Sequence, residues 1–468
     1  MNLQPPIAAL VISLLLAPFY AIGAAAEPAA PAVDVARGLE ADIPDGFTVA
    51  AVGDIQMSHP VRGDPGFGRV TGWISSADIA VGNFESNLID IRHFEGHPEP
   101  TTDSLRPVSD PALAQALSDA GFDLLGRANN HAVDWGHVGM RDTGDALDAA
   151  RLVHAGTGES LAAARAARYL AAPAGRIGLV AFTTTYEAAT PALPPLGEAP
   201  GRPGASTLPV RRIILVDAET MRALRRLHAA QPAGSAQSDP RQDRLFLFGT
   251  VYQESDRFGL AYELDQAALD EIVRSVRQGK LNADFLIVSV HSHEPGNWSE
   301  TPADFLPAVA HAMIEAGADM VVGHGPHRLR GIEIYRGKPI FYSLGNFAFQ
   351  IAPNEPVAAD LYQRLGGDPQ AMTAAELLQS RIGPHVQFDP LYESVVPVTT
   401  FRAGRAARIE LHPIALSLDA RMADRGVPRP AQGEQARRIL EHLARLSRPF
   451  GTEIRISGGL GVINGPRE

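Results

Sequence analysis

Residues 323–349 read GHGPHRLRGIEIYRGKPIFYSLGNFAF, and this stretch decides the fold. Its first motif, GHGPH, follows the short apolar run Met320–Val322, which is typical of a buried strand. His324 and His327 therefore lie in a Gly/Pro turn at the end of that strand. The β-prone residues that come next predict a hairpin over residues 332–343.

Outward from this stretch, apolar runs alternate with helical patterns along most of the chain. The expected strands are Phe47–Val52, Asp78–Val81, Phe122–Leu125, Arg176–Phe182, Phe285–Val290 and Met320–Val322. The expected helices are Pro111–Ala120, Val138–Leu152, Gln266–Gln278 and Asp304–Ala316. Strand–helix alternation of this kind predicts an α/β fold.

Polar side chains follow the carboxyl ends of five of these strands. In chain order they are Asp54; Asn83 and Glu85 of GNFE; Asn129, Asn130, His131 and Asp134 of RANNHAVDWG; His291, His293 and Glu294 of HSHE; and His324 and His327 of GHGPH. Because open α/β sheets bind ligands at this edge, we expect these side chains to meet in space. Imidazole and carboxylate donors without a thiol favour one or two divalent ions of Mn, Zn, Fe or Mg.

Each motif also has an ordinary structural explanation. Gly53-Asp54 alone is typical of a turn, Asp134 could cap a helix, and a single histidine at a strand end is more often a hydrogen-bonded structural residue. These explanations would require all the polar residues named above to gather at five strand ends by accident. The joint occurrence therefore favours a metal site.

The composition narrows the class of protein. The 468 residues are 45% apolar and 20% charged, as in ordinary globular proteins. Cys is absent, which excludes disulfides, thiolate zinc sites and thiol catalysis. The net charge of −12 argues against nucleic acid as a partner.

Segment boundaries follow from shifts in composition. Residues 1–26 contain an uncharged apolar run that ends in small residues, and they predict a secretory signal or an uncleaved N-terminal anchor, hence an extracytoplasmic location at the periplasm or cell surface. Residues 27–45 form a Pro/Ala-rich linker, and residues 46–415 form the main domain. We expect insertions at about 186–244 and 351–393, and a C-terminal helix and tail over 416–468.

At this point the chain resembles a known family. The order GD, GNxE, NNHxxDxG, HxHE and GHGPH, followed by RGIEIYRGKPIFYSLGNF, is similar to the CapA family of poly-γ-glutamate capsule synthesis proteins. That family is similar in fold to calcineurin-like metallophosphatases. The resemblance implies a four-layer α-β-β-α sandwich with insertions, and a role in capsule biosynthesis beside membrane-bound synthesis partners.

The resemblance also implies roles for individual residues. Glu85 would bridge two metals, Asp54 and His327 would complete one site, and Asn130, His291 and His324 would complete the other. His131 would act as general acid, oriented by Asp134. Asn83, His293 and Arg328 are candidate substrate contacts, Asn346 a supporting residue, and Trp298 a candidate wall of the pocket.

Two departures from the metallophosphatase pattern keep the reaction open. Gln56 stands where those enzymes usually have a histidine, and Glu85 stands where they usually have an aspartate. The first hypothesis is a metal-dependent hydrolase of a phosphoester or an amide-linked anionic polymer. The second is a non-hydrolytic, polyglutamate-binding component of polymer synthesis or export, and the third is a metal-independent acid/base enzyme such as a peptide epimerase.

Overall fold

Two β-sheets packed face to face organise the chain. The computed structural model describes residues 36–101, 105–232, 241, 243–351 and 356–465. The larger sheet has ten strands, with β23-β24-β21-β20-β1-β2-β5-β6 in order, β19 beside β1 and β22 beside β21. These strands are β1 (Thr48–Gln56), β2 (Ile79–Phe84), β5 (Leu124–Gly126), β6 (Val153–Ala155), β19 (Asn346–Phe349), β20 (Glu393–Arg402), β21 (Arg405–Ala415), β22 (Arg429–Pro430), β23 (Arg455–Ser457) and β24 (Leu460–Asn464).

The second sheet has six strands in the order β17-β18-β16-β15-β9-β8. They are β8 (Arg168–Ala172), β9 (Gly175–Thr183), β15 (Phe285–His291), β16 (Met320–His324), β17 (Ile332–Tyr335) and β18 (Lys338–Phe341). The strands β17 and β18 form the expected antiparallel hairpin. The central strands are parallel and buried on both faces, which explains why they read as continuous apolar runs in the sequence.

The apolar residues divide the domain into layers. One core lies between the sheets and includes the ring contact of Phe47 with Phe285, whose centroids are 5.3 Å apart. A second core joins the larger sheet to α1 (Pro65–Ser75), α2 (Ala112–Asp119) and α3 (Gly136–Ala149). A third joins the six-stranded sheet to α6 (Gln266–Lys280) and α7 (Phe305–Glu315). The order of layers is therefore α-β-β-α, which confirms the predicted sandwich.

Parallel pairing brings the ligand-bearing residues to one level. In the larger sheet Asp54 pairs with Asn83, and in the second sheet His291 pairs with His324. Both pairs lie at the carboxyl ends of their strands, and direct contacts join the two pairs across the sandwich. The site is built at this shared edge, as expected for parallel strands.

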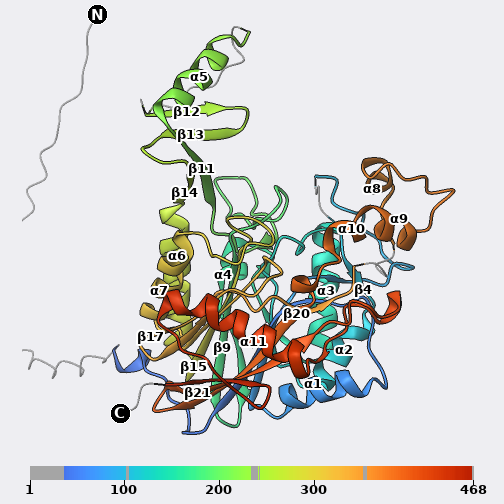
Figure 1. Cartoon of the computed structure of the whole chain (residues 1–468), viewed down its shortest axis with the longest axis vertical. Helices are drawn as coiled ribbons and strands as arrows, with labels where there is room; N and C mark the ends of the chain where they lie inside the picture. Colours follow the sequence, from blue (N-terminus) through green and yellow to red (C-terminus); the bar gives the residue numbers. More distant parts are fainter. Residues whose placement is uncertain (1–35, 102–104, 233–240, 242, 352–355, 466–468) are drawn as a thin grey trace, which may run out of the picture.

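Two additions extend from the sandwich (Figure 1). An arm contains a four-stranded sheet of order β12-β13-β11-β14, made of β11 (Val210–Val216), β12 (Arg244–Leu247), β13 (Thr250–Glu254) and β14 (Gly259–Leu264), with α5 (Ala218–Ala229). A helical lobe contains α8 (Ala359–Arg364), α9 (Ala374–Arg381) and α10 (Gly383–Val386). The lobe falls within the expected insertion at 351–393, whereas the arm reaches past residue 244.

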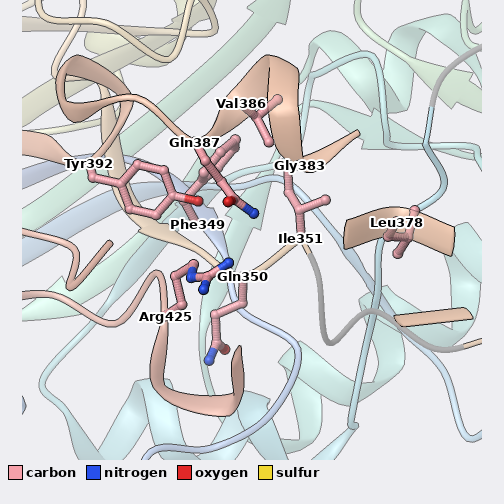
Figure 2. A pocket seen from close by; sticks show the side chains of 9 residues that line it. All are labelled: Phe349, Gln350, Ile351, Leu378, Gly383, Val386, Gln387, Tyr392 and Arg425. Carbon is pink, nitrogen blue, oxygen red and sulfur yellow. The ribbon is translucent and has the colours of Figure 1, made fainter. Parts of the chain in front are cut away.

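The lobe packs closely on the large sheet. Phe349 of β19 and Tyr392, which follows the lobe, line a cavity of about 10 Å³ together with Gln387 and Arg425 (Figure 2). A cavity of this size has room for about one water molecule. This cavity between lobe and sheet is therefore too small for a substrate.

The C-terminal end differs from the expected tail. The helix α11 (Gly433–Ser447) forms as predicted and buries Ile439, Leu440 and Leu443 against the inter-sheet core. After it, β23 and β24 form a hairpin that pairs with β21 and extends the large sheet. Gly458 and Gly459 make this possible, because both adopt positive φ in the two-residue turn.

The N-terminal signal or anchor of residues 1–26, and residues 233–240 and 242 of the expected insertion at 186–244, lie outside the described residues. Within the described ranges, no helix combines the length and apolar character needed to cross a membrane.

Candidate metal centre

Asp54 lies at the base of the site, fully buried near the end of β1. The chain approaches so closely here that a Cβ on Gly53 would lie 1.8 Å from the carbonyl oxygen of Gly345, so only glycine fits. Asn83 Nδ2 donates to Asp54 Oδ1 over 2.8 Å, and the Gly325 N–H donates to Oδ2 over 3.0 Å. Although burial acts to raise the pKa of Asp54, contact with His327 and these donors holds it below its usual value.

His291 and His324 stand beside Asp54 at the ends of β15 and β16. Their Nδ1 atoms lie 3.8 and 3.6 Å from Asp54 Oδ1, and 3.0 Å from each other. His324 Nε2 contacts the Ser289 hydroxyl at 2.7 Å, and His291 Nε2 contacts Asn130 Oδ1 at 2.8 Å. Because an amide oxygen can only accept, His291 carries its proton on Nε2 and directs the Nδ1 lone pair toward Asp54.

Burial keeps these rings neutral. It lowers the pKa of His324 to about 4, and it lowers the pKa of His291 well below the usual range, with the neighbouring histidines acting in the same direction. Metals bind the neutral form of imidazole, because its nitrogen lone pair is then free. The two rings are thus in the protonation state that a ligand requires.

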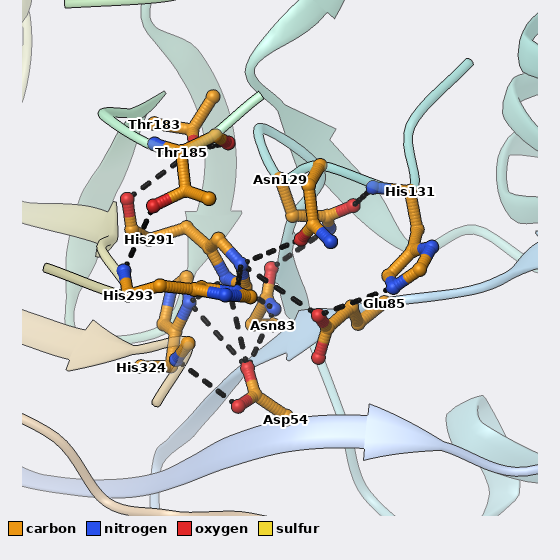
Figure 3. Close-up of polar contacts among 12 residues, drawn as sticks. Asp54, Asn83, Glu85, Asn129, His131, Thr183, Thr185, His291, His293 and His324 are labelled. Carbon is orange, nitrogen blue, oxygen red and sulfur yellow. Dashed lines mark hydrogen bonds and ion pairs between the residues drawn. The ribbon is translucent and has the colours of Figure 1, made fainter. Parts of the chain in front are cut away.

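Glu85 lies on the other side of His291 and is completely buried. Neither of its carboxylate oxygens has a hydrogen-bond partner among the described residues. Its Oε1 lies 3.6 Å from His291 Nε2 and 3.9 Å from His131 Nε2 (Figure 3). Burial, and then the nearby charge of Asp54, raise the pKa of Glu85 well above its usual value.

His293 and His327 complete a second set of donors around Glu85. His293 Nε2 lies 2.9 Å from His291 Nε2, and His293 and His327 have ring centroids 5.6 Å apart. His327 Nδ1 contacts Asn346 Oδ1 at 2.8 Å, which confirms the supporting role expected of Asn346. His327 adopts φ 56°, a strained conformation for a residue with a side chain, and such strain is concentrated at functional sites.

His131 lies at the rim of the cluster. Its Nδ1 contacts Asp134 Oδ2 at 2.6 Å, and its Nε2 faces Glu85. Asn129 holds the loop in place, because its amide nitrogen donates to Phe84 O and Asn83 Oδ1 while its oxygen accepts from the His131 N–H. The ring of His131 is therefore fixed, with one nitrogen on a carboxylate and the other facing the cluster.

The donors form two adjoining groups. Asp54, His291 and His324 make the first group, and Glu85, His293 and His327 make the second; within each, the ligand atoms lie within 4.8 Å of one another. The expected partition, in which His327 accompanied Asp54 and Asn130 accompanied His291 and His324, stays a prediction, because His327 Nδ1 also lies 3.4 Å from Asp54 Oδ2. Asn130 Oδ1 lies 2.8 Å from His291 Nε2, and His293 lies among the donors of the second group.

Comparison with known proteins gives the family. Residues 48–351 match the family model of the bacterial capsule synthesis protein PGA_cap. The chain is 42% identical over 443 residues to protein y4sH of Sinorhizobium fredii (strain NBRC 101917 / NGR234), covering 92% of this chain and 95% of that protein. The chain belongs to the PGA_cap family.

The family includes CapA, as the sequence motifs predicted. The capsule biosynthesis protein CapA of Bacillus anthracis is 26% identical over 312 residues, which cover 65% of this chain and 60% of that protein. Among solved structures, a hypothetical protein from Thermus thermophilus aligns over 78% of this chain and 98% of that one, with 15% identity and a TM-score of 0.34. That superposition is too loose to support an inference.

Other polar residues of this PGA_cap chain belong to neither donor group. Asn83 is fully buried and its amide nitrogen lies 2.8 Å from Asp54 Oδ1 and 3.4 Å from His291 Nδ1, whereas Arg328 pairs with Glu300. Arg127 donates to the Met140 carbonyl in α3. Gln56 is buried, and its amide opposes the rise in the pKa of Glu85 that burial and Asp54 produce.

Two residues of the site carried no signal in the sequence. Ser289 sits within the apolar run of β15, and only the structure shows its hydroxyl on His324. Thr185 accepts the N–H of His293 at 2.8 Å from a loop after β9. Trp298 lies where a wall was expected: its ring centroid is 5.6 Å from that of His327, and Phe388 of the lobe packs edge-on against it.

Proposed function

We propose that this PGA_cap protein is a metal-dependent hydrolase that acts on a phosphoester or an amide-linked anionic polymer in capsule synthesis. One observation carries the proposal: Glu85 is buried, has no hydrogen-bond donor among the described residues, and faces neutral imidazoles. A lone buried carboxylate is costly, and a cation between it and the rings removes that cost. The residues therefore fit a divalent metal pair.

The charges support the same conclusion. Asp54, Glu85 and Asp134 are three buried acidic groups within one cluster of histidine rings. Arg330, a buried arginine close to this cluster, gives its hydrogen bonds to backbone carbonyls. Two divalent ions would balance the acidic groups and leave a site able to attract an anionic substrate.

The protein residues have distinct tasks in such a reaction. Bound ions would supply a water activated at neutral pH and would neutralise charge on the group transferred. When both ring nitrogens of His131 carry a proton, Asp134 accepts a hydrogen bond from Nδ1–H, and Nε2–H is the donor available to the leaving group. Asn129 fixes the loop, and Trp298 excludes water from the side of His327.

Location and partners complete the proposal. The uncharged apolar stretch at residues 1–26 supports export to the periplasm or cell surface, where capsule polymer is assembled. Family membership supports a polymer-related substrate, and we include membrane-bound synthesis partners in the proposal.

Metal analysis of the purified chain, followed by assays with Mn or Zn, tests the proposal. We expect bound divalent metal in the wild type, and turnover of a generic phosphodiester or of poly-γ-glutamate that chelator abolishes. Polymer binding without turnover in any metal would favour the non-hydrolytic hypothesis. Activity that survives chelator would favour metal-independent acid/base chemistry and would reject the proposal.

A further inference from the structure

Arg330 is a fully buried residue whose guanidinium donates hydrogen bonds to the loop that follows β15. Its Nε donates to Ser299 O over 3.0 Å, and its Nη1 donates to Ser292 O over 3.2 Å. Its Nη2 donates to His293 O and Glu294 O over 3.2 and 2.7 Å. All three guanidinium nitrogens are thus engaged by backbone carbonyls of residues 292–299.

Burying the charge of Arg330 costs free energy, and its hydrogen bonds fix the position of one particular loop. Burial lowers the pKa of Arg330 to about 10, which shows how little solvent reaches the charge. The planar fork of arginine can hold several carbonyls at fixed angles, and the point charge of lysine cannot. Arg330 is therefore unsuited to bind substrate, and its geometry serves the loop.

The loop held by Arg330 carries a donor of the second group. His293 lies between the carbonyls of Ser292 and Glu294, both of which Arg330 holds. From the opposite side, Thr185 Oγ1 accepts the His293 N–H, and Glu294 accepts hydrogen bonds from the hydroxyls of Thr184 and Thr185. The backbone of His293 is fixed on both sides, although it lies in a loop.

The first group has different supports. His291 and His324 sit on paired strands, and Ser289 and Asn130 hold their outer nitrogens. Asp54 is held by Asn83 and Gly325. None of these contacts passes through Arg330, so a change at Arg330 should affect the second group more than the first, to which it is joined by the contact of His293 Nε2 with His291 Nε2 at 2.9 Å.

We propose that Arg330 is a positioning residue for the second metal: it fixes the backbone of His293 so that its imidazole lies with Glu85 and His327 in the second donor group. The inference rests on the proposed function, since it requires that both donor groups bind ions. Residues that orient metal ligands typically contribute about 10- to 100-fold to metal affinity.

Cobalt titration of the metal-free full-length chain tests the proposal, with absorbance and calorimetry as readouts. We expect two Co²⁺ per wild-type chain. In Arg330→Lys we expect the first ion to bind unchanged and the second to bind about 10- to 100-fold more weakly. Arg127→Lys is the matched control, because Arg127 is also buried, its pKa is also lowered to about 10, and it holds a carbonyl in α3 instead.

A double-mutant cycle separates positioning from general structural support. His293→Asn should weaken the second ion, and the Arg330→Lys/His293→Asn double variant should weaken it no further, because Arg330 acts through His293. If the two effects multiply, or if Arg330→Lys loses both ions equally, the positioning role is rejected.

The remaining outcomes are also decisive. Two ions of unchanged affinity in Arg330→Lys would overturn this inference and leave the proposed function intact. Fewer than two ions in the wild type would overturn the two-group site and this inference with it. Should Arg330→Lys fail to fold, Arg330→Gln, which keeps two N–H donors, is titrated in the same way.

Discussion

Asp134 accepts a hydrogen bond from His131 over 2.6 Å, and both side chains are buried beside Glu85. The carboxylate fixes which nitrogen of the ring faces the cluster. His131 is therefore oriented before substrate arrives, as a proton donor to a leaving group requires. It is not a member of either donor group, so its chemistry can be tested apart from metal binding.

We predict that His131→Asn lowers kcat by about 10²- to 10⁴-fold, the usual contribution of a general acid. Metal content should stay at the wild-type level. The loss should be smaller for a substrate with an activated leaving group such as p-nitrophenolate, since this group departs without a proton. Steady-state kinetics on two substrates, paired with metal analysis, checks the prediction. An equal loss on both substrates would argue against proton donation.

A second prediction concerns the pH dependence of stability in the metal-free protein. Burial and Asp54 raise the pKa of Glu85 in the folded state above its ordinary value of 4.5. Between these two values the folded chain holds a proton that the unfolded chain has lost, so Glu85 reduces the free energy of unfolding as pH rises. Glu85→Gln removes this contribution, and the stability gained by the variant should grow with pH across that window.

The histidines act in the opposite direction. Burial lowers the pKa of His291 and His324 below the ordinary value of 6.5, so they add stability as pH rises toward that value. The Glu85 contribution is therefore measured as the difference between wild type and Glu85→Gln in urea unfolding with chelator present. A difference that shrinks as pH rises would show that Glu85 is already ionised in the folded apoprotein.

A third prediction concerns a structural ion cluster outside the site. Lys280 and Lys338, the two lysines of the sequence, both contact the buried carboxylate of Asp319, with Lys280 Nζ 2.9 Å from Oδ2. Without that carboxylate, the buried ammonium of Lys280 loses its ion-pair partner. Asp319→Ala should therefore lower the free energy of unfolding by about 3–5 kcal/mol. Glu159→Ala, which breaks the exposed pair with Arg141, is the control and should cost about 1 kcal/mol or less.

Lysine chemistry gives an independent check of the same cluster. Because both amines are paired with Asp319, an amine-reactive reagent should modify the folded chain at neither lysine on the timescale that labels an exposed lysine. Peptide mapping before and after denaturation provides the measurement. Rapid labelling of Lys280 in the native protein would contradict its burial.

Much of the fold followed from periodicity, and its failures share a cause. Parallel strands such as β15 are buried on both faces, so they read plainly as apolar runs. The strands β13 and β24 alternate apolar and polar residues in short segments that resemble loops. Each of these strands follows a two-residue turn with positive φ, Phe248-Gly249 before β13 and Gly458-Gly459 before β24. Turns of this type favour hairpins, and their glycines were the features of the sequence that pointed to one.

For the site, the sequence predicted which strand ends meet, whereas the division of the donors between two ions came from the family resemblance and stays a prediction. Strand order brings His291 and His324 into register, and that is a property of the sheet. The donor group that a histidine joins depends on which of its ring nitrogens carries the lone pair that faces the site. For His291 this is set by Asn130, a residue far away in the sequence whose Oδ1 contacts His291 Nε2. The place of His293 depends in turn on the loop held by Arg330, which no local pattern encodes.

The last prediction concerns the stability that metal confers. An ion that binds only the folded chain should stabilise it by about 2.7 kcal/mol at a free concentration of 100 Kd, so Mn²⁺ or Zn²⁺ should raise Tm in a dose-dependent way. His324→Ala removes a donor of the first group and should reduce that shift, whereas His131→Asn leaves both groups whole and should retain it. Thermal unfolding of the three proteins across a metal series, with Mg²⁺ as the weakly binding comparison, gives the measurement. Equal shifts in wild type and His324→Ala would show that the stabilising ion binds elsewhere, because His324 Nδ1 faces Asp54 at 3.6 Å and an ion held by the first group would contact it.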